Sequence, residues 1–334
     1  MDLKSISKKP IKEFCNLKIP TIILGKGSFK NILNWLREIK CTKVILVTSQ
    51  SFINKDLHYS RLLSFFKDLN ISYKIIIIKN EPSSDFIDEE VLNLKNKNFD
   101  AVIGIGGGSV IDLGKALSAI VPIGKSILNY LNEPDSFSLS LGIKLPYLVL
   151  PTTSGTGGEA TRNAVVTNIG PLGFKKSIRH NNLIPDHVII DGELLVSTPI
   201  KITAACGMDA FTQLIEAYIS QSSSPFSDAI AWSGLEFFIS NFELACITNS
   251  DNIEVRQALA YSALCSGIAL ANADLGIVHG IAVPMGGFYK IPHGEACARL
   301  LSASLKINFN ALTKRDNTNP SLLQLIRISN LIDH

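Results

Sequence analysis

The first half of this 334-residue chain alternates short apolar runs, rich in β-branched residues, with longer amphipathic stretches. The apolar runs lie at residues 20–24, 43–48, 72–78, 101–105 and 147–150, and the amphipathic stretches lie at 29–39, 56–68, 86–96 and 109–120. Strands that are apolar on both faces and separated by helices are typical of βαβ units, whose parallel sheet is covered on both sides. The alternation therefore predicts a Rossmann-like, doubly wound α/β domain.

The pattern changes after Thr198-Pro199. Before this point two more strand-like runs occur, at 164–167 and 187–191, and after it long helical stretches follow at 200–220, 225–242, 253–271 and 295–309. Pro225 starts one of these stretches, which is a position that proline favours in a first helical turn. We expect a nucleotide-binding α/β domain over residues 1–182 and a helical domain over residues 183–334, with a site in the cleft between them.

Composition excludes several classes of protein. Hydrophobic residues make up 46% of the chain and charged residues 18%, which favours a folded protein, and the net charge of +3 is too weak to indicate nucleic-acid or membrane partners. No apolar run approaches the roughly 18 residues of a membrane span, and the N-terminus lacks a signal-peptide core. The six cysteines are scattered without CxxC pairs, as expected of reduced core thiols. We predict a cytoplasmic protein with a small-molecule partner.

A glycine-rich turn follows the strand-like run at 101–105. Gly106, Gly107 and Gly108 are followed by Ser109, where a helical stretch begins. Glycines let a backbone approach a pyrophosphate closely, and a helix N-terminus offers unpaired N–H groups and a positive dipole end. Ser109 is placed to cap the helix and to donate to phosphate. The alternative is a tight strand–helix turn without a ligand, but the placement between strand and helix favours phosphate.

A second turn, Pro151-Thr-Thr-Ser-Gly-Thr-Gly-Gly-Glu-Ala-Thr161, follows the strand-like run at 147–150. Its hydroxyl groups suit a ribose, a phosphate or a nicotinamide amide. The alternative is a surface loop, which is the commoner fate of such clusters.

The helical half carries polar residues in apolar surroundings. Asp209, Gln213 and Glu216 are spaced by four and three residues, so they share one helix face. Two of the six histidines, His279 and His293, lie beside glycines further along the chain. With Asp209 they would make a three-ligand divalent site with an open position. Spacing alone favours the alternative, two histidines that are hydrogen-bonded separately near turns.

Taken together, four motifs resemble the iron-containing (group III) alcohol dehydrogenases. They are Gly106-Gly-Gly-Ser-Val-Ile-Asp112, the run from Pro151 to Thr161, Gly207-Met-Asp-Ala210, and His279 with Pro292-His-Gly294. The resemblance runs in order from about residue 20 to 301, and it implies the fold shared with dehydroquinate synthase.

The resemblance also implies an activity, the transfer of a hydride between NAD or NADP and a small alcohol or aldehyde. The implied cofactor-binding residues are Gly106, Gly107, Gly108, Ser109, Asp112, Thr152, Thr153, Thr161 and Lys175, with Lys176 an adjacent candidate for the lysine near the ribose. The implied ligands of Fe²⁺ or Zn²⁺, which carry the catalysis, are Asp209, position 213, His279 and His293. Family members are often dimers or larger homo-oligomers.

The chain departs from the family at several positions. The family usually has a histidine ligand where this chain has Gln213, whose amide oxygen is a weaker ligand, and this departure is typical of a less characterised branch. Val283 replaces a further histidine near the substrate, so we expect a more apolar pocket. The chain also ends at His334, before helices that members usually have.

Cofactor choice depends on the residue after the run at 43–48. Members that prefer NAD often carry an acidic residue there, which binds the ribose hydroxyls and repels a 2′-phosphate. This chain has Ser49, so we expect NADP to be tolerated.

Two other functions compete with an active oxidoreductase. A carbon–oxygen lyase of the dehydroquinate synthase type needs a cluster of cationic groups on phosphate, and residues 200–300 hold only Lys201, Arg256, Lys290 and Arg299. A nucleotide-binding remnant without activity is favoured by Gln213, Val283 and the short tail. The intact glycine turns and the intact Asp209, His279 and His293 argue against a remnant.

Overall fold

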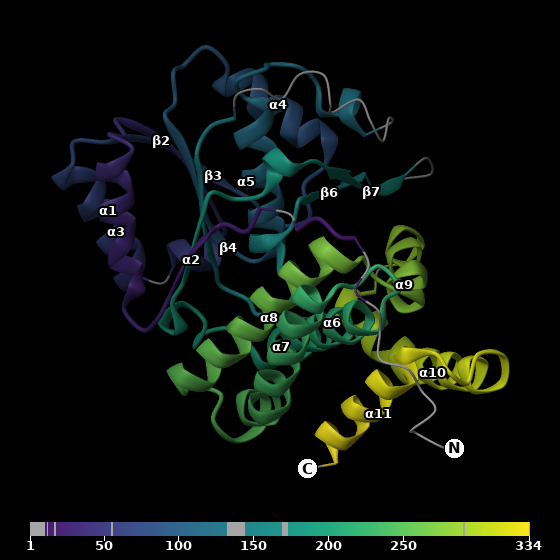
Figure 1. The fold of residues 1–334 in the computed structure, drawn as a ribbon. Helices are drawn as coiled ribbons and strands as arrows, with labels where there is room; N and C mark the ends of the chain where they lie inside the picture. The colour runs from purple at the N-terminus through teal and green to yellow at the C-terminus, as the bar shows by residue number, and fades with distance from the viewer. Residues whose placement is uncertain are drawn as a thin grey trace. The chain divides into compact units, whose positions relative to one another are not determined.

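Six parallel strands form the central sheet of the first of two units, in the order β1-β8-β5-β4-β2-β3 (Figure 1). The computed structural model describes residues 11, 13–16, 18–54, 56–131, 144–168, 173–289 and 291–333. The α/β unit contains residues 18–153 and 158–198, and the helical unit contains Ser154–Gly157 and the chain from Pro199 onward. The strands are β1 (Thr21–Leu24), β2 (Lys43–Thr48), β3 (Ser72–Ile77), β4 (Ala101–Gly106), β5 (Tyr147–Pro151) and β8 (His187–Ile190).

Helices cover this sheet on both faces, as the apolar runs predicted. The helices are α1 (Asn31–Glu38), α2 (Gln50–Ile53), α3 (Asp56–Asp68), α4 (Ser84–Leu94) and α5 (Gly108–Ile120). Val44 and Leu46 of β2 belong to the core formed with α1 and α3. Successive side chains of a strand point to opposite faces, and Ile45 and Val47 are fully buried on the other side, where α5 packs. This double burial confirms the predicted Rossmann-like, doubly wound architecture.

The strand order reverses between β2 and β4. From β2 the chain continues outward to β3, then returns to the other side of β2 as β4 and continues to β5. Because the strands are parallel, their carboxyl ends meet at one edge of the sheet. There Thr48 at the end of β2 pairs with Ile105, and Gly106 at the end of β4 pairs with Pro151. Ligands of open α/β sheets bind at the carboxyl ends of strands at such a reversal.

Two expectations about the end of this unit need correction. The predicted strand at 164–167 does not join the parallel sheet: it is β6 (Asn163–Asn168), which pairs in antiparallel fashion with β7 (Phe174–Arg179). The expected boundary at residue 182 falls too early, because β8 lies between β1 and β5 inside the sheet. The α/β unit therefore continues to Thr198.

The helical unit is built on three long helices, α6 (Ile200–Ile219), α7 (Pro225–Glu243) and α8 (Ile253–Ala273), which pack on one another. Ser224 caps α7 through a capping box, and Pro225 occupies its first turn as predicted. By length and composition alone, residues Pro225–Thr248 would suffice to cross a membrane, a test that core helices of soluble proteins also pass.

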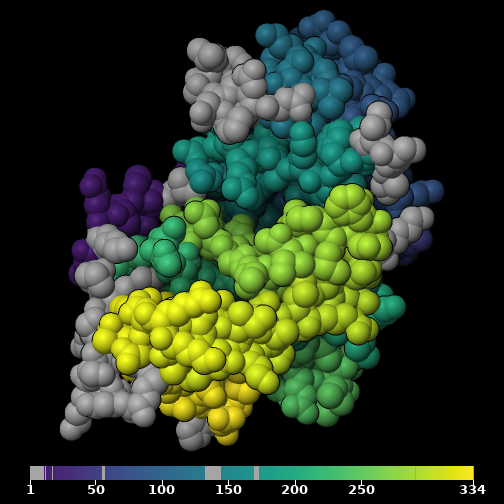
Figure 2. All heavy atoms as spheres, turned by 90° about the vertical axis from the view of Figure 1, so that its right-hand side faces the viewer, coloured from purple at the N-terminus to yellow at the C-terminus, as the bar shows by residue number. Residues whose placement is uncertain are grey.

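Within its described residues, this unit continues with α9 (Ile277–Phe288), α10 (His293–Arg315) and α11 (Pro320–Ile332). α9 and α10 lie side by side at the surface, drawn in yellow-green and yellow (Figure 2). The sequence did not predict α9, because Gly280, Pro284, Gly286 and Gly287 all lower its helix propensity. Packing on the rest of the unit overrides that propensity.

Candidate active site

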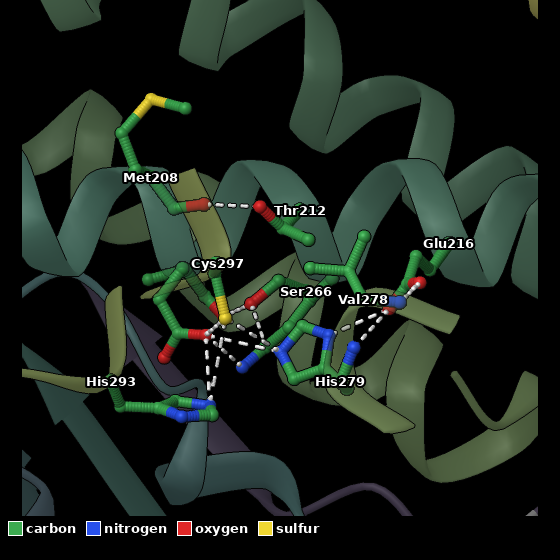
Figure 3. Close-up of polar contacts among 11 residues, drawn as sticks. Met208, Thr212, Glu216, Ser266, Val278, His279, His293 and Cys297 are labelled. Atoms are coloured by element: carbon green, nitrogen blue, oxygen red, sulfur yellow. Dashed lines mark hydrogen bonds and ion pairs between the residues drawn. The ribbon is translucent and has the colours of Figure 1, made fainter. Parts of the chain in front are cut away.

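Four side chains of the helical unit converge on one point (Figure 3). Asp209 comes from α6, His279 from α9, and His293 and Cys297 from the first turns of α10. One ligand-type atom of each lies within 4.8 Å of the others. The structure therefore brings together Asp209, His279 and His293, the three residues that the sequence proposed for a divalent metal.

The polar face of α6 contributes Asp209 to this centre and lines it. Asp209, Gln213 and Glu216 are 3%, 5% and 3% exposed, so the face predicted from their spacing is real and faces inward. Buried carboxylates and amides are costly unless they are paired. Each of the three is hydrogen-bonded to a neighbour within the helical unit.

Glu216 orients His279. Its Oε2 lies 2.6 Å from His279 Nδ1, and its two oxygens accept the backbone N–H groups of Val278 at 2.7 Å and His279 at 3.3 Å. A carboxylate at Nδ1 holds a proton there, which makes Nε2 the atom that coordinates a cation once it has released its own proton. Nε2 lies 3.2 Å from Asp209 Oδ1, on the side of the centre. Glu216 therefore prepares His279 to act as a metal ligand.

A close helix approach positions His293. It is the first residue of α10, and its Nε2 lies 3.6 Å from Asp209 Oδ1. The next residue, Gly294, lies so close to α6 that a Cβ would sit 1.9 Å from the carbonyl oxygen of Ala205. The His293-Gly294 pair is thus explained by packing: the glycine lets α10 start against α6, and the histidine then reaches Asp209.

The charges of the centre are strongly coupled. Burial alone would raise the pKa of Asp209, but the hydrogen bond from His279 and the nearby charge of His293 hold that pKa below its usual value. Burial alone would lower the pKa of His279, but hydrogen bonds to Asp209, Cys297 and Glu216 raise it to about 11. The carboxylates thus stabilise positive charge at this point, and metal ligands must release their protons when a cation binds.

Gln213 lies beside the centre, but its amide oxygen is turned away. Its Nε2 donates to Asp209 Oδ1 at 3.3 Å, and its Oε1 accepts from the hydroxyl of Ser266 at 2.8 Å. In this arrangement the atom predicted as a metal ligand is bonded to Ser266, and Gln213 supports Asp209.

Cys297 was not predicted as part of the site, since the cysteines were interpreted as core thiols. It is fully buried, and its Sγ lies 3.8 Å from Asp209 Oδ1, 3.7 Å from His279 Nε2 and 3.8 Å from His293 Nε2. One signal was available: Cys297 follows His293 by four residues, so the two share a helix face.

The glycine turn lies at the reversal of strand order in the α/β unit. Gly106 ends β4, Gly107 is the N-cap of α5 without a side-chain cap, and a Cβ on Gly106 would lie 2.4 Å from the side chain of Val110. The expectation that Ser109 caps the helix is wrong, because Ser109 already lies in the first turn. The first N–H groups of a helix lack intrahelical partners, and the N-cap residue Gly107 has no side chain to cap them, which suits a phosphate.

Ser49 and the threonines after β5 follow the strands on either side of β4. Ser49 directly follows β2, whose last residue pairs with Ile105 of β4, and the Ser49 hydroxyl lies 2.8 Å from that of Ser51. The N–H of Thr152 donates to the carbonyl of Gly106, and Thr153 lies 3.2 Å from where a Cβ of Gly107 would be. Thr152 and Thr153 therefore lie against the glycine turn, whereas contact of Ser49 with a cofactor stays a prediction.

Thr161, Lys175 and Asp112 are engaged with other protein groups. The buried ammonium of Lys115 donates to the hydroxyl and the carbonyl of Thr161, both at 2.9 Å. Lys175 pairs with Glu81 at 2.5 Å. Burial raises the pKa of Asp112 to about 7, although the charge of Lys115 opposes this. For these three residues contact with a cofactor stays a prediction.

Comparison with known proteins identifies the family. The family model described as iron-containing alcohol dehydrogenase matches residues 20–192, and the model of its C-terminal domain matches residues 203–327. The chain is 31% identical to the NAD-dependent methanol dehydrogenase of Bacillus methanolicus, over 89% of this chain and 76% of that protein. It is 32% identical to the NADPH-dependent butanol dehydrogenase of Clostridium saccharobutylicum, over 87% and 73%. The crystal structure of a 1,3-propanediol oxidoreductase matches with a TM-score of 0.82 and 27% identity, over 96% and 87%.

The chain belongs to the iron-containing alcohol dehydrogenase family. This confirms the predicted fold and the predicted class, an NAD(P)-dependent, metal-containing oxidoreductase that moves a hydride to or from a small alcohol.

Proposed function

We propose that the protein interconverts short alcohols and aldehydes with NADP or NAD, at a divalent metal held by Asp209, His279 and His293. The observation that carries this proposal is the convergence of the three side chains with Glu216 behind His279. A carboxylate and two imidazoles form a donor set that suits Fe²⁺ or Zn²⁺. Three protein ligands of this kind are typical of catalytic metals, which keep a position for substrate.

The cofactor is proposed to bind at the reversal of strand order in the α/β unit. The uncapped start of α5 would receive the pyrophosphate, and Thr152 and Thr153 offer hydroxyl groups beside it. Ser49 lies where an acidic residue would repel a 2′-phosphate, which supports the use of NADP.

The chemistry divides between the bound groups and the protein. Bound by Asp209, His279 and His293, a divalent metal would polarise an oxygen of the substrate, and the nicotinamide ring would carry the hydride. The residues hold the geometry: Glu216 keeps the Nδ1 proton of His279, and Asp209 supplies the negative charge that balances a cation. One turn after His279, α9 carries Val283, so no imidazole stands there to relay a proton.

The test combines metal analysis with turnover. The protein is purified without chelator, bound metal is measured by elemental analysis, and oxidation of NADPH and NADH is followed with a panel of short aldehydes. We expect about one divalent ion per chain and turnover that chelation abolishes. No metal after reconstitution and no turnover with either cofactor would overturn the proposal and leave a nucleotide-binding remnant.

Two predictions go with this proposal. We expect a homodimer or larger homo-oligomer, which light scattering on the purified protein measures, and location in the cytoplasm, which cell fractionation tests.

A further inference from the structure

Five of the six distances between the four donor atoms of the centre are close to the edges of a metal-sized tetrahedron, and the sixth, between the two imidazole nitrogens, is at most 4.8 Å. Asp209 Oδ1 lies 3.2 Å from His279 Nε2 and 3.6 Å from His293 Nε2, and Cys297 Sγ lies 3.7–3.8 Å from these three atoms. Zinc bonds of about 2.0 Å to nitrogen or oxygen and about 2.3 Å to sulfur imply tetrahedral edges of roughly 3.3 Å and roughly 3.5 Å. Each of these five distances is therefore within a few tenths of an ångström of that arrangement.

Gln213, the residue expected to complete the ligand set, does not offer its oxygen at this point. The amide nitrogen faces Asp209, and the oxygen accepts from Ser266. An N–H group cannot coordinate a cation, since it carries no free lone pair. The fourth corner is instead taken by the thiol of Cys297, which α10 presents one turn after His293.

We infer that Cys297 is a metal ligand and that its thiolate makes this an Asp/His/His/Cys centre that selects zinc over iron. The inference rests on the proposed function for the presence of a metal, but it concerns the fourth ligand and the metal chosen. Binding of a divalent cation displaces the thiol proton of Cys297 to solvent, and the thiolate sulfur donates a lone pair. Thiolates favour zinc among divalent metals of the cell, whereas oxygen-rich and imidazole-rich sets are less selective. With Cys297 as fourth ligand the substrate oxygen would take a fifth position, to which catalytic zinc sites sometimes expand.

The test uses cobalt(II) as a spectroscopic substitute for the native metal. The protein is loaded with Co²⁺, and the thiolate-to-cobalt charge-transfer band in the near ultraviolet is recorded for the wild type, Cys297→Ala and Cys297→Ser. Cys265→Ser is the matched control, because Cys265 is also buried in the helical unit but is not part of the cluster. We expect the band in the wild type and in the control, and no band in either Cys297 variant.

Metal affinity gives the second readout. We expect Cys297→Ala to weaken Zn²⁺ binding by about 100-fold or more, beyond the ~10–100-fold lost with an outer-shell partner, and Fe²⁺ binding by about tenfold or less. Gln213→Ala should weaken zinc binding far less than Cys297→Ala does. A wild-type protein that binds Co²⁺ without the band, or a Cys297→Ala variant with unchanged zinc affinity, would overturn the inference.

These readouts separate the two proposals. A thiolate band in a protein without turnover on any short aldehyde supports the ligand assignment and sinks the proposed function. Turnover with a bound metal and no band does the opposite.

Discussion

Glu216 is the residue whose replacement tests the organisation of the centre most directly. In Glu216→Gln one carboxylate oxygen becomes an amide NH₂ of nearly the same size, so packing is kept while one acceptor becomes a donor. If the amide nitrogen replaces Oε2, it faces His279 Nδ1, where it favours the tautomer with the proton on Nε2, and it also opposes the backbone N–H of His279. If it replaces Oε1, it faces the N–H of Val278, and two donors oppose each other.

Either placement of the amide nitrogen costs free energy, and the contacts of Glu216 indicate how much. A buried donor left without an acceptor costs about 1–3 kcal/mol. In the first placement the cost falls on metal binding, since the proton on Nε2 must move before His279 can coordinate. Loss of such a partner behind a ligating histidine typically lowers metal affinity by roughly 10–100-fold. In the second placement the cost falls on folding of the helical unit.

The assay measures both quantities. Zinc affinity is measured by competition with a chelating dye, and thermal unfolding is followed with and without zinc. Glu243→Gln, the same change at an exposed position of α7, is the control and should leave both values unchanged. A Glu216→Gln protein with wild-type zinc affinity and wild-type unfolding temperature would refute the argument that Glu216 orients His279.

Three further predictions follow from particular contacts. Gly294→Ala should destabilise the protein by about 1–3 kcal/mol or more and weaken metal binding, because the added Cβ meets the Ala205 carbonyl. In the control Gly280→Ala, the added Cβ meets nothing within 4 Å, so this change should be neutral or slightly stabilising. Thermal unfolding of the two variants measures the difference. Burial raises the pKa of Glu159 from 4.5 to about 7, so its ionisation is disfavoured in the folded state, and stability present below pH 4.5 is lost as pH rises to about 7. The free energy of unfolding, measured by denaturant titration, should fall between pH 5 and pH 8 by on the order of 2–3 kcal/mol less in Glu159→Gln than in the wild type. An equal fall in the two proteins would contradict the raised pKa of Glu159. Ser49→Asp should lower kcat/KM for NADPH by about tenfold or more while sparing NADH, and an unchanged ratio in steady-state kinetics would remove Ser49 from the cofactor site.

Elements of the α/β unit were predictable wherever the local pattern was strong. The apolar run at 43–48 and the amphipathic stretch at 56–68 match β2 and α3 residue for residue, because side-chain periodicity depends only on the element itself. α9 was missed, since its glycines and its proline argue against a helix and only packing on the unit stabilises it. The strand β8 was expected at the transition between the two domains, and its place inside the sheet was missed, because strand order is a property of the whole sheet.

The amino-acid sequence by itself determined the family, the βαβ alternation, the glycine turn and the shared face of Asp209, Gln213 and Glu216. These features are recognised from contiguous runs or from helical spacing, and neither depends on contacts with distant parts of the chain. Only the tertiary structure decided that Cys297 joins Asp209 and that the Gln213 oxygen turns to Ser266. Those contacts link α6, α8 and α10, whose mutual approach is set by long-range helix packing and by glycines that leave room for it.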